Sequence, residues 1–190
     1  MVHALGVFSV LIILIFDRFL GALIMLFIAI GLILFGEYRK NKLLTKILRI
    51  GPVKEIEDVI DNEIKSYERL KEIPLNGAVM FFLGAFLVTA AFEARVAIAS
   101  IAVLALADSI STLVGYYFGK HKLSINKKKT WEGSSAFFIT AFFVLLFFVD
   151  PFKSLLTGLL VTLVEMMPKI NDNISVPFST AIFLTLMITI

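Results

Sequence analysis

The feature that most constrains this chain is the separation of its charged residues from long apolar runs. Hydrophobic residues make up 59% of the 190 residues, the mean hydropathy is +0.94, and the charged residues, 17% of the chain, gather in a few connections. A water-soluble fold of this length needs more polar surface than that. The sequence therefore predicts a membrane protein and excludes a disordered, collagen-like or coiled-coil chain. The chain has no cysteine, which excludes disulfides, zinc thiolate sites and cysteine nucleophiles.

The apolar runs predict the membrane-spanning helices. A bilayer core of about 30 Å needs about 17–25 apolar residues per helix, or fewer where a helix packs inside a bundle. We expect the first span to be retained, because the start at Met1 lacks the basic segment and cleavage site of a signal peptide. The expected fold class is all-α, a polytopic membrane helix bundle forming a single integral membrane domain over 1–190, with its motifs in 75–190. The seven expected spans are 4–16, 19–35, 75–92, 96–118, 133–149, 152–167 and 176–190.

Lysine and arginine are divided unevenly between the two ends of these spans. With seven crossings, the connections 37–72, 119–132 and 168–175 share one side, and they contain nine, five and one of the 18 basic residues. The opposite side has Arg18, Arg95 and Lys153. Basic connections are retained in the cytoplasm. We therefore predict a multi-pass protein of the cell membrane with a cytoplasmic N-terminus and an outside C-terminus.

The longest connection, 37–72, is amphipathic. After Gly51-Pro52, apolar residues recur at spacings of three and four, which predicts a helix with one apolar stripe. We expect this cytoplasmic helix to lie on the membrane interface between spans two and three. A regulatory or partner-binding role is the alternative. The stripe consists of Ile56, Val59, Ile60, Ile64, Tyr67 and Leu70.

An acidic residue lies inside the fourth span. At helical spacing, Asp108, either Ser111 or Thr112, and Gly115 share one face with Gly119. This face offers a carboxylate, a hydroxyl and bare backbone, which suits the close approach of a phosphate or a metal ion. An ionisable residue within an apolar span is costly and is therefore a functional candidate. The alternative is a helix-packing motif, Gly115-x-x-x-Gly119, with Asp108 paired to a lysine of the bundle.

The connection after this span is rich in lysine and leads into the next helix through small polar residues. Together these residues would form a cradle for a polyphosphate. The alternative is that the lysines only orient the chain in the membrane. A Walker-type P-loop is excluded, because the spacing from Gly115 to Gly119-Lys120 is one residue short and His121 replaces the magnesium-binding hydroxyl. The residues concerned are Lys120, Lys122, Lys127, Lys128 and Lys129, followed by Thr130, Trp131, Glu132, Gly133 and Ser134.

Acidic and amide side chains lie near the last connection. Glu165 closes the sixth span, and Asn171-Asp172-Asn173 precedes Val176-Pro177. Their oxygens suit magnesium, which prefers a few carboxylates together with water and substrate phosphates. Taken alone, Asn-Asp-Asn is typical of a turn, so both interpretations stay open. A histidine-based metal centre is not expected, since the chain has only two histidines.

In combination, these motifs resemble those of a known family. The order Asp108-x6-Gly115-x3-Gly119-Lys120, Lys128-Lys129-Thr130-x-Glu132-Gly133-Ser134, Glu165 and Asp172-Asn173 resembles the CTP-dependent isoprenoid-alcohol kinases. These include dolichol kinase, phytol kinase and the CTP-dependent diacylglycerol kinase. The resemblance covers residues 75 to about 178. The family's Asp-Asp-Asn loop is Asn171-Asp172-Asn173 here, so one expected carboxylate is an amide.

The resemblance implies a kinase that transfers the γ-phosphoryl group of CTP, with Mg²⁺, to a polyprenol- or dolichol-type alcohol at the cytoplasmic membrane face. No nucleic-acid partner is expected. The implied catalytic residues are Asp108, Glu132 and Glu165, with Glu165 or Asp108 accepting the alcohol proton and Glu132 orienting a lysine. The implied magnesium ligands are Asp108, Asp172 and Asn173. The residues implied to bind CTP are Ser111, Gly115, Gly119, Lys120, Lys128, Lys129, Thr130, Gly133 and Ser134.

Two other functions are compatible with these residues. A CDP-lipid synthase uses similar magnesium and CTP contacts, but a lipid phosphate then attacks the α-phosphorus. A transporter carries polar groups near the membrane midplane, on the broken helices of two repeated halves. This chain shows no clear repeat, and its polar groups other than Asp108 lie beside the basic connections, which favours chemistry at the interface.

Overall fold

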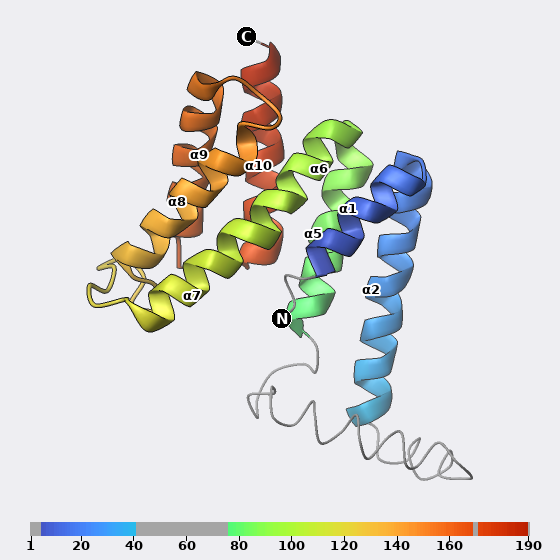
Figure 1. Ribbon diagram of the computed structural model, residues 1–190. Helices are drawn as coiled ribbons and strands as arrows, with labels where there is room; N and C mark the ends of the chain where they lie inside the picture. The colour runs from blue at the N-terminus through green and yellow to red at the C-terminus, as the bar shows by residue number, and fades with distance from the viewer. Residues whose placement is uncertain (1–4, 41–75, 169–170, 190) are drawn as a thin grey trace.

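A computed structural model describes residues 5–40, 76–168 and 171–189 of the chain, and this part is helical (Figure 1). One isolated β-bridge, between Lys122 and Thr130, is the only strand-like pairing within it. The helices α6, η2 and α7 follow one another without a break, so the described part contains seven continuous helices. The elements are α1 (Leu5–Ile15), α2 (Arg18–Lys40), α5 (Asn76–Ala91), α6 (Ala94–Val103), the π-helical turn η2 (Leu104–Asp108), α7 (Ser109–Tyr117), α8 (Trp131–Leu145), α9 (Pro151–Glu165) and α10 (Asp172–Thr189).

The helices coincide with the apolar runs of the sequence, and three of them are long and apolar enough to cross a bilayer. These three are Arg18–Glu37, Ala94–Tyr117 and Asp172–Thr189. Two further apolar helices, Asn76–Ala91 and Trp131–Leu145, are shorter. The all-helical fold class is therefore confirmed for the described residues, whereas seven membrane crossings stay a prediction. The expected interfacial helix after Gly51-Pro52 lies outside the described residues.

Two predicted boundaries differ from the structure by four residues. The fifth span was expected to end at residue 149, but α8 ends at Leu145. The seventh span was expected to begin at residue 176, but α10 begins four residues earlier, at Asp172. The side chain of Asn171 accepts a hydrogen bond from the backbone N–H of Asn173, at 3.1 Å, in the manner of an N-terminal cap. Asp172 and Asn173 consequently belong to the first turn of a helix rather than to a free loop, and Pro177 is accommodated inside that helix.

Arginines at the turns between helices satisfy backbone carbonyls at helix ends. Arg18 donates to the carbonyl oxygen of Phe92, just after α5, at 3.0 Å. Arg95 donates to the carbonyl oxygen of Phe148, just after α8. The last carbonyls of a helix lack partners within it, and a nearby cation stabilises them. Two of the three basic residues predicted to lie outside therefore have a structural role, because each satisfies a carbonyl at the end of another helix.

Small residues bring the helices close together around the core. The helix α2 packs mainly on α5, and α10 contacts α5, α6 and α9. The fully buried residues include the large side chains of Phe81, Phe137 and Leu184, as well as small ones such as Ala85 and Ala97. Without a strong hydrophobic driving force between helices in lipid, such close contacts supply much of the association energy.

The polar connections gather at one end of the bundle. Figure 1 shows the connection from α7 to α8 and the start of α10 at one end, while the turns from α1 to α2, α5 to α6 and α8 to α9 lie toward the other. The two connections that carry the lysine and acidic motifs therefore face the same way. The assignment of this end to the cytoplasm stays a prediction.

Candidate active site

Asp108 lies at the end of a π-helical turn within the longest helix. The turn η2 inserts an extra residue between α6 and α7, and π-turns of this kind are frequent at functional sites. Asp108 and Ser111 are both buried, with exposed fractions of 9% and 7%, and both line a cavity. The sequence showed the shared face of these residues but carried no signal for the π-turn.

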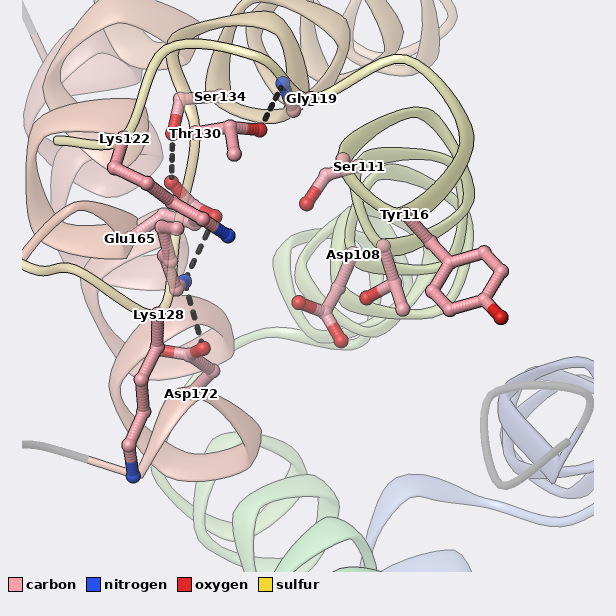
Figure 2. A pocket seen from close by; sticks show the side chains of 14 residues that line it. Asp108, Ser111, Tyr116, Gly119, Lys122, Lys128, Thr130, Ser134, Glu165 and Asp172 are labelled. Carbon is pink, nitrogen blue, oxygen red and sulfur yellow. Dashed lines mark hydrogen bonds and ion pairs between the residues drawn. The ribbon is translucent and has the colours of Figure 1, made fainter.

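Most of the predicted site residues surround one cavity of about 640 Å³ at the polar end of the bundle (Figure 2). Its walls come from α7, the following connection, the first turn of α8, the end of α9 and the start of α10. Segments that are far apart in the sequence therefore meet at one place. The predicted residues that line this cavity are Asp108, Ser111, Gly115, Gly119, Lys128, Lys129, Thr130, Gly133, Ser134, Glu165 and Asp172.

Three predicted residues, Lys120, Glu132 and Asn173, do not line this cavity. Lys120 is exposed. Glu132 accepts hydrogen bonds from the backbone of His121 and lies 2.7 Å from its Nδ1. Hydrogen bonds from its own backbone N–H, from His121 and from Lys120 lower the pKa of Glu132 to about 2. In this structure Glu132 therefore pairs with His121 and orients no lysine.

An ion-pair network centred on Lys129 joins four segments of the chain. Its Nζ donates to Glu165 Oε1 at 2.7 Å and lies 2.8 Å from Asp172 Oδ2. The second oxygen of Glu165 accepts a hydrogen bond from Ser134 Oγ at 2.9 Å. Glu165 is almost fully buried, with an exposed fraction of 1%. Since charges are buried only when they are paired and hydrogen-bonded, this network fixes the relative positions of α8, α9, α10 and the lysine connection.

The electrostatics of this network keep Lys129 protonated. Burial lowers the pKa of the Lys129 ammonium, but the negative charges of Asp172 and Glu165 raise it by more, so it lies above its usual 10.5. A positive charge is therefore held inside the cavity over the whole physiological pH range.

Three glycines make room for Thr130 between α7 and α8. A Cβ on Gly119 would lie 2.7 Å from Thr130 Cγ2, and a Cβ on Gly133 would lie 3.1 Å from Thr130 Oγ1. Thr130 in turn caps α8 by accepting a hydrogen bond from Gly133 N at 3.1 Å. The corresponding distance for Gly115 is 3.2 Å, also to Thr130 Oγ1. Gly115 and Gly119 therefore do make a close packing contact, with Thr130, as the helix-packing interpretation predicted. The same two glycines also line the cavity.

The lysine connection is a short hairpin-like loop. Leu123 N donates to Lys129 O, and Trp131 N donates to His121 O, at 3.0 and 2.9 Å. The buried side chain of Leu123 anchors the loop. Lys122 and Lys128 both line the cavity, and Figure 2 shows the Lys122 ammonium near Glu165, while the Lys128 side chain extends past Asp172. From the sequence, Lys122 is named only as one of the five lysines of the cradle and is not assigned to CTP, since nothing in a lysine-rich run marks which members the backbone pairing turns inward.

A second cavity of about 320 Å³ adjoins the first and shares Asp108, Lys128, Lys129 and Asp172 with it. Asn173 lines only this second cavity, where its Nδ2 donates to the carbonyl of Gly77 at 3.2 Å. Sequence reasoning also missed Asn126, a buried amide in this cavity, and Tyr116 in the larger one. A spacing of four from Thr112 would have placed Tyr116 on the Asp108 face.

The side-chain oxygens at the start of α10 suit a magnesium ion in part. The buried oxygens Asp172 Oδ1 and Asn173 Oδ1 have no hydrogen-bond partner in the described part of the chain. Carboxylate and amide oxygens are hard ligands of the kind that Mg²⁺ binds. The same part of the chain brings together no group of three His, Cys, Asp or Glu side chains that would hold a metal alone. A magnesium ion here would depend on substrate phosphates for its remaining ligands.

Several curated relatives of this chain are named as phytol kinases. A probable chloroplastic phytol kinase of Triticum aestivum is 30% identical over 133 residues, which cover 60% of this chain and 44% of the relative. Phytol kinase 1, chloroplastic, of Arabidopsis thaliana is 28% identical over 154 residues, which cover 70% of this chain and 49% of the relative. The chain is a homologue of the phytol kinases. The resemblance seen in the motifs is thereby confirmed.

The homology to the phytol kinases is partial in length. The chain spans about half the length of the first two phytol kinases, at 44% and 49%. An uncharacterized protein of Rickettsia prowazekii (strain Madrid E) is 31% identical, over 62% of this chain and 63% of that protein. No protein-family model matches the chain, and no solved structure matches it.

Proposed function

We propose that this protein is a membrane-embedded kinase that transfers the γ-phosphoryl group of CTP to the hydroxyl of an isoprenoid alcohol at the cytoplasmic face of the membrane. The observation that carries the proposal is the cavity, which is lined both by Lys122, Lys128 and Lys129 and by the carboxylates of Asp108 and Asp172. The names of the phytol kinase relatives support an isoprenoid alcohol as acceptor. The choice of CTP rests on the family resemblance of the motifs.

The lysines supply what phosphoryl transfer chiefly needs, which is positioning and charge neutralisation. Lys122 and Lys128 lie on the loop side of the cavity and bind the triphosphate. Lys129, held by Glu165 and Asp172, places a permanent positive charge at the inner end of the cavity. The glycine backbone at Gly119 and Gly133 allows the phosphates to approach closely.

Asp108 is the group that takes the acceptor proton in this mechanism. Both oxygens of Glu165 are engaged, by Lys129 and Ser134, so Glu165 acts by positioning Lys129. The alcohol oxygen forms a bond to the γ-phosphorus while the bond from that phosphorus to the β,γ-bridging oxygen breaks. The hydroxyl proton passes to the Asp108 carboxylate, and CDP leaves with the bridging oxygen.

Asp172 and Asn173, with Asp108 close by, would hold the expected Mg²⁺. Their unpartnered oxygens fit a hard cation. When bound, the ion would neutralise phosphate charge and orient the leaving group. Without the ion, these side chains still present hydrogen-bond acceptors to the cavity, and the Lys129 ammonium partly balances the negative charge of Asp172.

Labelled CTP separates this proposal from its main alternative. Purified protein would be incubated with phytol, geranylgeraniol or a polyprenol and with CTP carrying the label at either the γ- or the α-phosphate. We expect the label from the γ-phosphate to appear in the lipid. The rates with phytol, geranylgeraniol and the polyprenol are then compared. A parallel incubation uses phosphatidic acid as the lipid. Label from the α-phosphate in that lipid would identify a CDP-lipid synthase instead.

Matched variants tie the activity to the cavity. Lys128→Met should lower kcat/KM for CTP at least tenfold, since it removes a charge from the triphosphate wall. Lys127→Met is the control, because Lys127 is an exposed neighbour that does not line either cavity. An active enzyme that responds equally to both substitutions would contradict this assignment of the phosphate site.

A further inference from the structure

The larger cavity has two walls of opposite character. One wall is the lysine connection and the start of α8, which present Lys122, Lys128 and Lys129. The other wall is α7, which contributes hydroxyl groups, a glycine and the ring of Tyr116. The sequence of α7, SISTLVGYY, contains no charged residue. A triphosphate and an apolar chain would therefore be drawn to different sides of the same cavity.

The α7 wall continues directly into an apolar outer surface. Leu113 and Tyr117 follow Thr112 and Tyr116 by one position, so their side chains lie about 100° further around the helix. All four are exposed, and so is Ile110. In the described residues the main packing partner of α7 among the other helices is α8, which leaves this outer side uncovered. Because α7 ends a helix long enough to cross the bilayer, we expect this side to adjoin lipid.

Tyr116 stands at the edge between the cavity and this outer surface. Its exposed fraction is 81%, and it nevertheless lines the cavity. Figure 2 shows Asp108 and Ser111 between the Tyr116 ring and the lysine side chains. A molecule that reached the cavity over Tyr116 would meet the Asp108 carboxylate before the lysines.

We propose that Tyr116, with Thr112, forms the subsite for the isoprenoid units that follow the first unit of the acceptor alcohol, which reaches the cavity laterally from the bilayer over α7. The inference rests on the proposed kinase activity. A methyl-branched chain packs on the flat face of the tyrosine ring, while the phenol oxygen stays at the polar edge. The alcohol hydroxyl then lies at Asp108, and the nucleotide occupies the lysine wall opposite.

Tyr116→Ala tests the subsite by separating the two substrates. We expect KM for geranylgeraniol to rise about tenfold, the equivalent of a lost apolar side-chain contact, while KM for CTP stays within twofold. Tyr116→Phe keeps the ring and should restore the wild-type KM. Prenol, a single-unit isoprenoid alcohol, is too short to cover the ring, so its kcat/KM should be equal in the wild type and Tyr116→Ala.

Phe147→Ala is the matched control, since Phe147 is an aromatic residue of similar exposure, 85%, and lines neither cavity. The proposal is overturned if Phe147→Ala raises the alcohol KM as much as Tyr116→Ala does. It is also overturned if Tyr116→Ala raises KM for CTP instead, or affects prenol and geranylgeraniol equally.

A photoreactive geranylgeraniol analogue tests the subsite without turnover. Crosslinking should map to α7, fall in Tyr116→Ala and persist in Phe147→Ala. If the wild-type protein transfers no phosphate from CTP but this labelling pattern is found, the proposed reaction fails and the lipid subsite stands. If the wild type is an active kinase and crosslinking is unchanged in Tyr116→Ala, the subsite is rejected while the kinase activity stands. Thermal unfolding of each variant shows that it is folded.

Discussion

Lys129 and Glu165 lie 36 positions apart in the chain, and their side chains form a 2.7 Å ion pair beside the larger of the two cavities. Glu165 is buried at the end of α9, and Lys129 reaches it from the loop before α8. Asp172 shares the same ammonium from the start of α10. The pair therefore holds together the elements that build the site, and several predictions depend on it.

Replacing Glu165 should weaken both the fold and the site. Glu165→Gln removes the buried charge that Lys129 and Ser134 contact, and we expect a loss of about 2 kcal/mol in unfolding free energy, as for hydrogen bonds to charged groups. Thermal unfolding in detergent measures it. Thr157→Val on the same helix is the control, because the buried Thr157 hydroxyl has no hydrogen-bond partner in the described residues. Equal losses in both variants would contradict the role of the pair.

The ion pair gives stability a defined dependence on high pH. The pKa of Lys129 is raised above 10.5 in the folded protein, so its contribution is fully present below 10.5 and is lost as the pH rises through the folded-state value. Lys129→Met should remove this part of the alkaline destabilisation, measured as thermal unfolding at neutral pH and above 10.5. Lys127→Met, at an exposed lysine, should leave the pH dependence unchanged.

Gly84 supports the site from the neighbouring helix. A Cβ at this position of α5 would overlap the backbone oxygen of Asn173, so Gly84→Ala must displace the first turn of α10 together with Asp172. We expect a destabilisation of about 1–3 kcal/mol, as for overpacking, and a loss of kinase activity. Gly31→Ala is the control, since a Cβ there meets nothing within 4 Å and should be neutral or slightly stabilising. A fully stable and active Gly84→Ala would argue against this packing.

Asp108→Asn should abolish turnover while the protein still inserts and folds. A proton acceptor is worth about a hundredfold or more in kcat, and the amide cannot take the proton. The Mg²⁺ concentration for half-maximal residual activity should stay the same if Asp108 acts on the alcohol. A large increase in that concentration would instead make Asp108 a metal ligand, and wild-type activity would remove it from the site altogether.

Cysteine labelling tests the predicted orientation, and the cysteine-free chain makes it simple. Ser124→Cys lies on the exposed part of the lysine connection, and Glu93→Cys lies in the exposed turn before α6. An impermeant thiol reagent added to intact cells should label position 93, and should label position 124 only after permeabilisation. The reverse pattern would mean an inverted topology, and the use of cytosolic CTP would then be untenable.

The sequence by itself determined the helices and the identity of most residues around the cavity. Apolar runs must form helices in a bilayer, because every backbone polar group there has to be satisfied within the segment. The spacing of Asp108, Ser111 and Gly115 placed one polar face on one helix. The charge distribution predicted that the connection from α7 to α8 and the start of α10 share one end, as Figure 1 shows.

Only the tertiary structure decided which of these residues act together. Lys122 and Lys120 are alike in sequence, yet the backbone pairing of the loop turns Lys122 into the cavity and leaves Lys120 outside. Glu132 and Glu165 are both acids beside polar motifs, but Glu132 pairs with His121 while Glu165 pairs with Lys129. Ion pairs across a bundle depend on how helices distant in the chain pack against one another, and local periodicity contains no information about that packing.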